Sequence, residues 1–139
     1  MSHNGDTHDP SRRALVDRYV MAVENADIVA LKRLLTADVV LEMPPVPSWF
    51  VGREAYGRFI AHIFALRGSA WRLLPTAANG QLAVAAYVRG QDGAYHVHTL
   101  QVFTVTGSGI SHNVVFQDPS LFALFGLAPS LDATHTRID

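Results

Sequence analysis

Four side chains of this sequence have the types needed for acid–base chemistry, provided that the fold brings them together. They are an imidazole (His98), two carboxylates (Glu42 and Asp118) and a phenol (Tyr87). A carboxylate beside an imidazole orients its tautomer and raises its basicity. A tyrosine hydroxyl can donate a hydrogen bond to a developing oxyanion. We predict Asp118 as general base assisted by His98, Tyr87 as the group that polarises a carbonyl, and Glu42 as a second acid, with no cofactor.

A second set of residues is typical of an apolar binding site. The stretch LEMPPVPSWFVG, residues 41–52, places three prolines between a carboxylate and two large aromatic side chains. Prolines fix the direction of the chain at little entropic cost, so we expect this segment to form the lip of a cavity. Trp49 would be either a lid over a flat ligand or a plug that leaves no cavity. Gln101 is an alternative to Tyr87 for polarising a carbonyl. The predicted ligand contacts are Met43, Trp49, Phe50, Gln101, Asn113 and Phe116.

Cap residues and apolar spacing predict three helices in the first half of the chain. Asp9-Pro10 is a helix start, and the helix should end near Asn25. Asp27 caps a second, shorter helix. A short strand at residues 38–43 and the proline segment precede a third helix at residues 52–66, which Gly68 closes.

After this helix the apolar period changes from helical spacing to two. Strands are expected at residues 71–78, 81–89, 94–106 and 110–117, separated by turn signals at residues 79–80, 92–93 and 107–109. Helices followed by an antiparallel meander predict an α+β domain, with the helices packed on one face of a curved sheet.

Counting across these hairpins places the acid–base residues at one end of the sheet. Tyr87 and His98 share a face for either even length of the second loop, barring a bulge. The preferred three-residue last loop pairs Leu100 with Phe116 and His98 with Asp118, and leaves Asn113 on the opposite side. A two-residue loop would instead put Asn113, Val115 and Gln117 on the His98 face. That opposite side, which includes Gln101, is equally apolar. Either face could hold the cavity, and a second subunit could cover the face that the helices do not.

Length and composition favour one domain that binds neither nucleic acid nor membrane. The chain has 139 residues, with eleven basic and twelve acidic side chains and no cysteine. It shows no basic stripe, no signal peptide and no apolar run of about 20 residues. We expect a disordered N-terminus (residues 1–8), a single domain (9–131), a flexible tail (132–139), a cytoplasmic location and a homodimer.

Four stretches of the sequence resemble one family of domains. LEMPPVPSWFVGREA, WRLLPTAANGQLAVAAYVR, HTLQVFTVTG and VVFQDPSLFALFGL are similar to segments of the SnoaL-like domain at the C-terminus of extracytoplasmic-function sigma factors. The resemblance runs from about Leu15 to Leu131. It implies the cone-shaped α+β fold of the nuclear transport factor 2-like superfamily, which ketosteroid isomerases and limonene epoxide hydrolases share. This chain resembles a free-standing copy of that domain.

The resemblance also bears on function and on particular residues. Free-standing relatives often act in secondary metabolism as polyketide cyclases, isomerases or epoxide-opening enzymes on hydrophobic molecules, and SnoaL-like cyclases use an aspartate where Asp118 stands. Ketosteroid isomerases have a tyrosine pair that includes a residue of the first helix. Tyr19 lies in that helix and fits the core equally well. The resemblance implies an aliphatic residue where Asn113 stands, so this polar side chain would be either solvent-facing or a new ligand contact.

Several alternatives stay open at this level. Asp118 could simply cap a C-terminal helical turn, and His96 with His98 could bind a metal if a third ligand joined them. The domain as a whole could be a cofactor-independent enzyme, a non-catalytic ligand-binding or regulatory module, or a structural dimerisation domain.

Overall fold

The structure of the chain is a computed structural model that describes residues 10–45, 49–78 and 80–131. The segments predicted to be disordered at the N-terminus and flexible at the C-terminus lie outside the described residues.

The three predicted helices are confirmed. They are α1 (Pro10–Glu24), α2 (Ile28–Arg33) and α3 (Arg53–Arg67). The Asp27 carboxylate caps α2 by accepting a hydrogen bond from the Ala30 amide at 3.0 Å. At the end of α3, Gly68 has a φ of 89°, which glycine adopts without a steric penalty, and its amide donates to the Phe64 carbonyl.

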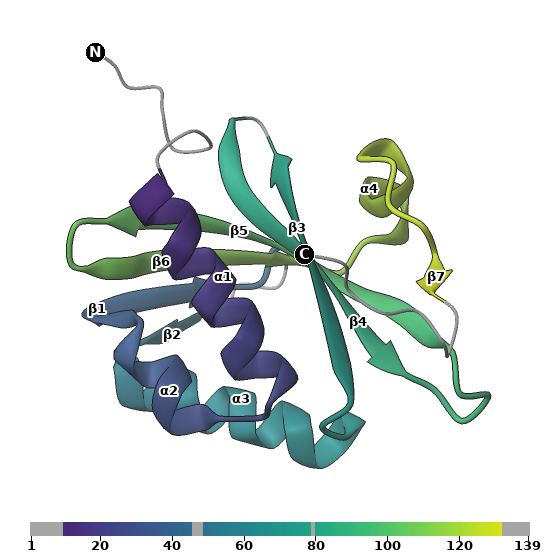
Figure 1. The fold of residues 1–139 in the computed structure, drawn as a ribbon, viewed down its shortest axis with the longest axis horizontal. Helices are drawn as coiled ribbons and strands as arrows, with labels where there is room; N and C mark the ends of the chain where they lie inside the picture. The colour runs from purple at the N-terminus through teal and green to yellow at the C-terminus, as the bar shows by residue number, and fades with distance from the viewer. Residues whose placement is uncertain (1–9, 46–48, 79, 132–139) are drawn as a thin grey trace.

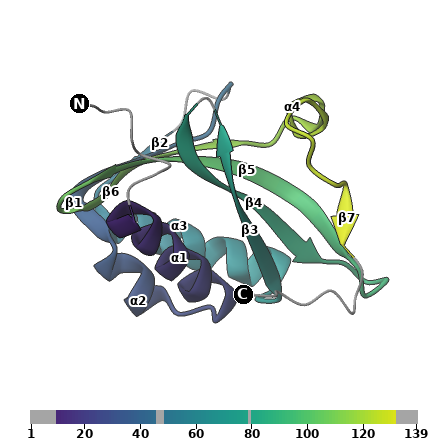
Figure 2. The ribbon, with the colours of Figure 1, turned by 45° about the horizontal axis from the view of Figure 1, so that its top comes forward.

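The strands form one curved sheet that arches over the three helices (Figures 1 and 2). Its order is β2-β1-β6-β5-β4-β3, with β7 paired to β5. The β1–β6 pairing is parallel and the other pairings are antiparallel. The strand bounds are β1 Leu35–Glu42, β2 Trp49–Val51, β3 Trp71–Ala78, β4 Gln81–Arg89, β5 Tyr95–Thr106, β6 Gly109–Phe116 and β7 Ser130–Leu131.

The first strand and the proline-rich segment differ in detail from the prediction. β1 begins at Leu35, three residues before the predicted strand at 38–43. The end of the proline-rich segment forms β2, a three-residue strand at the edge of the sheet, where Trp49 pairs with Glu42.

Apolar side chains cover both faces of the sheet. The main core lies between the sheet and the helices and contains Tyr19, Tyr56 and Phe103. On the other face, Phe122 of α4 (Pro119–Leu124) packs with Leu100. The C-terminal segment of the chain therefore covers part of the face for which a second subunit was expected.

The strand count is wrong at one position of the β4–β5 hairpin. Ala86 pairs with Thr99, but Tyr87 pairs with Val97, so His98 is an extra residue on β5. Such a bulge reverses the side of the sheet to which the following residues point. The predicted shared face of Tyr87 and His98 is thereby lost, because Tyr87 packs in the cluster on the face opposite the helices.

The last hairpin keeps the predicted pairing in its middle but not at its turn. Leu100 pairs with Phe116, as predicted. Thr106 pairs with Gly109 rather than with Ile110, and a register shift after Thr104 compensates for the shorter turn. Ile110 consequently packs in the helix-side core instead of beside Phe116.

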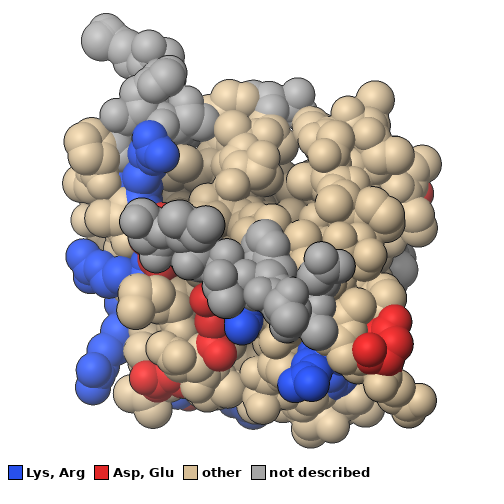
Figure 3. All heavy atoms as spheres, turned by 45° about the vertical axis from the view of Figure 1, so that its right-hand side comes forward, with Lys and Arg blue, Asp and Glu red and all other residues tan. Residues whose placement is uncertain are grey.

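Charged side chains of both signs are interspersed along the lower part of the face shown in Figure 3. Within the described part of the chain, no helix is long and apolar enough to cross a membrane.

Candidate functional site

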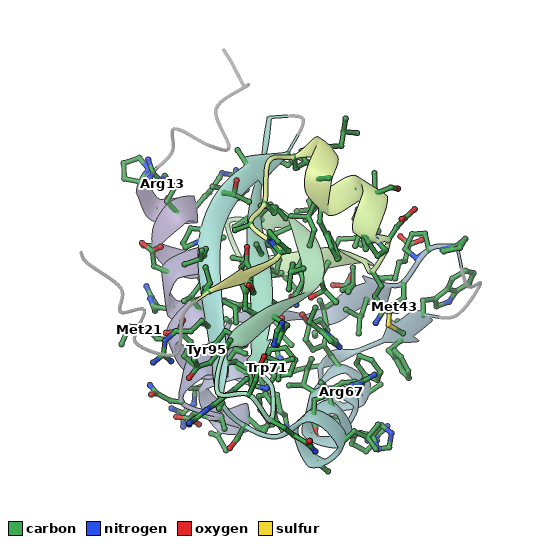
Figure 4. The ribbon with its side chains drawn as sticks, turned by 90° about the vertical axis from the view of Figure 1, so that its right-hand side faces the viewer. Arg13, Met21, Met43, Arg67, Trp71 and Tyr95 are labelled. Carbon is green, nitrogen blue, oxygen red and sulfur yellow. The ribbon has the colours of Figure 1, made fainter. Side chains whose placement is uncertain are left out.

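A cavity lies between the concave face of the sheet and the helices α1 and α3. Its empty space is about 540 Å³ when the part open to solvent is included, whereas the centre of a water molecule can reach about 50 Å³. The large difference indicates a narrow space closely lined by side chains. In Figure 4, Trp71 and Met43 mark two sides of this region, and Arg67 lies at the end of α3 below them.

Most of the cavity wall is apolar. Helices contribute Val23, Phe59, Ile60, Ile63 and Phe64, and the sheet side contributes Leu41, Met43, Trp71, Ala86 and Val115. The polar lining residues are Tyr19, His98, Thr99, Gln101, Asn113 and Gln117. None of these described lining residues is Asp, Glu, Lys or Arg, so the cavity wall supplies no full charge unless His98 is protonated.

Four buried or half-buried polar side chains on α1, α3, β5 and β6 form one hydrogen-bonded cluster. The hydroxyls of Tyr19 and Tyr56 lie 2.7 Å apart. Tyr19 also donates to Gln101 Oε1 at 3.1 Å. Asn113 Nδ2 donates to the Tyr56 hydroxyl at 2.8 Å and to Gln101 Oε1 at 3.1 Å. We call Tyr19, Tyr56, Gln101 and Asn113 the polar cluster.

The polar cluster is anchored in the core and stays neutral. Tyr19 and Tyr56 are 1% and 0% exposed, and Gln101 Nε2 donates to Thr99 Oγ1 at 3.0 Å. Burial raises the pKa of Tyr56 to about 12, and burial together with the neighbouring Tyr56 holds the pKa of Tyr19 well above its usual value. Both phenols are therefore protonated at neutral pH.

His98 is the one imidazole among the described residues of the cavity wall. Its ring stands nearly perpendicular to that of Trp71, at an interplanar angle of 87°, with centroids 5.2 Å apart. Burial, and secondarily the positive charge of Arg67, lower the pKa of His98 below its usual value. At neutral pH the imidazole is therefore uncharged and can accept a proton.

The predicted grouping of His98 with Asp118 and Tyr87 is not formed. Asp118 is exposed and caps α4, since its carboxylate accepts from the amide and the hydroxyl of Ser120 at 2.9 and 2.8 Å. These bonds lower the pKa of Asp118. The alternative role as a helix cap is thus confirmed for Asp118. On the opposite face of the sheet, Tyr87 donates to the Ala128 carbonyl at 2.8 Å.

Glu42 also points away from the cavity. Leu41 lines the cavity, so the next residue of the strand faces the other side of the sheet. There the Glu42 carboxylate pairs with His112 Nε2 on the neighbouring strand β6. The cavity wall therefore contains none of the other three predicted acid–base residues, Asp118, Tyr87 and Glu42, and they cannot exchange a proton with a molecule in the cavity.

The predicted ligand contacts divide into two groups. Met43, Gln101 and Asn113 line the cavity. Phe116 packs on the opposite face, and Phe50 stacks on Phe59 with centroids 4.6 Å apart rather than lining the cavity itself. Trp49 is 59% exposed and is not a wall residue, so in this structure it neither plugs nor lids the cavity.

The structure gives no support to a metal pair at His96 and His98. His96 is exposed and its Nε2 lies 3.0 Å from an Asp92 carboxylate oxygen, whereas His98 lines the cavity. Over the described ranges, no group of three or more His, Asp or Glu side chains is placed to hold a metal ion.

Among the polar side chains of the site, Tyr56, Thr99 and Gln117 were not singled out from the sequence. Tyr56 belongs to the apolar stripe of α3, where a tyrosine is indistinguishable from a core residue. For Tyr19 the one available signal was the resemblance to the isomerases with a tyrosine pair. In the structure, the Tyr19 hydroxyl is in hydrogen-bond contact with the hydroxyl of Tyr56 on α3.

Comparisons with known proteins agree with this architecture. Residues 16–119 match the SnoaL-like domain family. The ECF RNA polymerase sigma factor SigG of Mycobacterium tuberculosis is 37% identical over 123 residues, which are 88% of this chain and 33% of the sigma factor. The chain thus spans about a third of the length of this curated relative.

Two solved structures share the fold at low sequence identity. A candidate ketosteroid isomerase from Kribbella flavida superposes with a TM-score of 0.62 and 21% identity, covering 91% of this chain and 89% of the other. A candidate polyketide cyclase from Sinorhizobium meliloti superposes with a TM-score of 0.58 and 21% identity, covering 73% of this chain and 93% of the other. Together with the family match, these findings establish that the chain belongs to the SnoaL-like domain family.

Proposed function

We propose that this protein binds a neutral, mainly apolar small molecule in the cavity between the sheet and helices α1 and α3. The observation that carries the proposal is the composition of the cavity wall: apolar side chains, one hydrogen-bonded polar cluster, and no carboxylate or cation among the described lining residues. Apolar pockets with a few convergent polar groups are typical of small-molecule sites. The narrow space favours a flat or slender ligand.

The sigma-factor relative supports binding as the primary role. A domain that is 37% identical to part of a transcription factor is compatible with a ligand sensor, which needs affinity but no chemistry. The position of Asp118 also supports this choice, because the carboxylate predicted as the base is exposed and bonded to Ser120.

Binding can be measured through a tryptophan of the cavity wall. The chain has two tryptophans, so Trp49→Phe leaves Trp71 as the sole reporter. We expect α-tetralone, a flat bicyclic ketone, to change the Trp71 fluorescence saturably. Ile63→Phe adds volume to the cavity wall and should weaken binding. Leu66→Phe is the matched control, because Leu66 lies on the same helix but is 64% exposed. Equal affinities for the two variants and the parent protein would refute a ligand site in this cavity.

A second candidate function is proton transfer on the bound molecule, as in an isomerase or cyclase. His98 favours it, because an uncharged imidazole on an apolar cavity wall can remove a proton from carbon next to a carbonyl. His98 would then act as base without a carboxylate partner, and the reaction would need no cofactor.

This candidate is tested without knowing the substrate. The protein would be incubated with α-tetralone in D₂O, and deuterium uptake beside the carbonyl followed by NMR. We expect His98→Gln to abolish protein-dependent uptake, while His96→Gln, a change at an exposed histidine of the same strand, leaves it unaltered. Binding without any protein-dependent uptake would leave the protein as a binding module.

A further inference from the structure

The polar cluster contains an unsatisfied acceptor. Asn113 is 1% exposed, and its Oδ1 is the single buried side-chain oxygen or nitrogen in the described part of the chain that has no hydrogen-bond partner. Buried polar atoms without a partner are rare, and each one requires an explanation. Because Asn113 also lines the cavity, a bound molecule is one way to supply the missing partner.

The hydrogens of the polar cluster can be followed one by one. Gln101 Oε1 can only accept, so the single hydroxyl hydrogen of Tyr19 is directed to it. Tyr56 must therefore be the donor in the contact between the two tyrosine hydroxyls. The two hydrogens of Asn113 Nδ2 are used by Tyr56 and Gln101. Neither tyrosine nor Asn113 retains a hydrogen for a ligand.

The polarity of the site follows from this arrangement. A pocket that polarises a ketone must present hydroxyl or amide hydrogens to the carbonyl oxygen. Here the tyrosine hydrogens point into the cluster, and the unpaired atom is an acceptor. The Gln101–Thr99 bond leaves one amide hydrogen of Gln101 and the hydroxyl hydrogen of Thr99 unused, so these two side chains, and not the tyrosines or Asn113, are the donors that a carbonyl could meet.

Resting on the proposed binding function, we infer that the ligand carries a hydrogen-bond donor, such as an alcohol, a phenol or an N–H group, which Asn113 Oδ1 accepts. A donor of this kind satisfies Asn113 and costs the cluster none of its present bonds. A ketone of the same shape leaves Asn113 Oδ1 unpaired and places a second acceptor near it.

The test compares α-tetralol with α-tetralone, which differ mainly in the replacement of a hydroxyl by a carbonyl. Affinities are measured by calorimetry on the full chain and on two variants. We expect α-tetralol to bind about tenfold more tightly than α-tetralone, the ratio that one satisfied buried acceptor produces. Asn113→Leu should remove this preference. Thr99→Val, a change at another polar residue of the cavity wall, should retain it.

Each outcome has a distinct consequence. Equal or tighter binding of α-tetralone overturns the inference while leaving the binding function intact, and would mean that the Asn113 and Gln101 amides are rotated so that the cluster presents a donor. Loss of the preference in Thr99→Val but not in Asn113→Leu also overturns it. Binding of neither compound refutes the binding function together with the inference. The comparison on the unchanged protein does not depend on whether Asn113→Leu folds, which circular dichroism would establish.

Discussion

Replacing Tyr56 by phenylalanine isolates the contribution of the polar cluster to stability. The Tyr56 hydroxyl is fully buried, donates to Tyr19 and accepts from Asn113. Phenylalanine keeps the ring and its packing, so the change removes two hydrogen bonds and little else. One amide hydrogen of Asn113 then has no acceptor, and it is too deeply buried to bond to bulk water.

The expected loss in the free energy of unfolding can be estimated from these contacts. An ordinary neutral hydrogen bond contributes about 1 kcal/mol net, and a buried donor left without a partner costs about 1–3 kcal/mol. Tyr56→Phe should therefore destabilise the protein by about 3 kcal/mol. Tyr87→Phe is the matched control. It removes one bond, to the carbonyl of Ala128, and because Ala128 is exposed, water can replace it. Its cost should be about 1 kcal/mol or less.

Urea denaturation followed by circular dichroism would measure the loss in the free energy of unfolding for Tyr56→Phe and for Tyr87→Phe. The same measurement on Tyr19→Phe and on the double variant would give the coupling energy between Tyr19 and Tyr56. Because Tyr19 and Tyr56 share one bond, the double variant should be less destabilised than the sum of the single variants, by about 1 kcal/mol. Tyr87 lies on the other face of the sheet and should add to Tyr56 without coupling. Additive effects of Tyr19→Phe and Tyr56→Phe, or equal costs for Tyr56→Phe and Tyr87→Phe, would refute the hydrogen-bonded cluster.

Three further predictions concern other parts of the molecule. The pKa of His98 is lower in the folded than in the unfolded chain, so the unfolded chain takes up the proton first as the pH is lowered. The free energy of unfolding should therefore decrease as the pH is lowered below about 6.5. His98→Gln should make this decrease smaller, as measured by urea titrations at several pH values. Gly109→Ala should destabilise the protein by about 2 kcal/mol, because the φ of Gly109 is +137° and a Cβ there would lie 2.6 Å from the carbonyl oxygen of Leu34. Gly107→Ala is the control: a Cβ at Gly107 would meet no atom within 4 Å, so this change should alter the free energy of unfolding by about 0.5 kcal/mol or less. Asp118→Ala should cost about 1 kcal/mol in thermal unfolding through loss of the α4 cap, without altering deuterium uptake by α-tetralone.

The sequence was sufficient for the first three helices and the strands of the meander, but not for the faces of the sheet or the short strands β2 and β7. Caps, turns and apolar periods located the three helices of the first half and the four strands of the meander, because these signals are local. The face assignment failed at His98, since a single extra residue on β5 separates it from Tyr87. A bulge changes the outcome of a period-two count without leaving a signal in the composition of the strand.

The polar cluster was beyond prediction for a different reason. Its hydrogen bonds join residues 12, 37, 57 and 82 positions apart in the chain, from two helices and two strands. Spacing within one element carries no information about such contacts. Asn113 was the partial exception. The family resemblance implied an aliphatic residue there, so a polar one was a reason to suspect a ligand contact, although its hydrogen-bond partners became visible only in the folded chain.

The distribution of charge constrains what the cavity can select. Outside the cavity, the Glu42 carboxylate pairs with His112 and the Asp118 carboxylate caps the N-terminus of α4. The positive charge of Arg67 helps to keep His98 uncharged. An ionised ligand would lose its hydration without meeting a counter-charge, which is costly in an apolar site. Selection must then operate among neutral molecules. A site that satisfies a ligand's hydroxyl rejects the analogue lacking it far more strongly than an apolar wall rejects a missing methylene. We therefore expect the direction of the hydrogen bonds in the polar cluster, rather than charge, to determine which end of a ligand is held at Asn113.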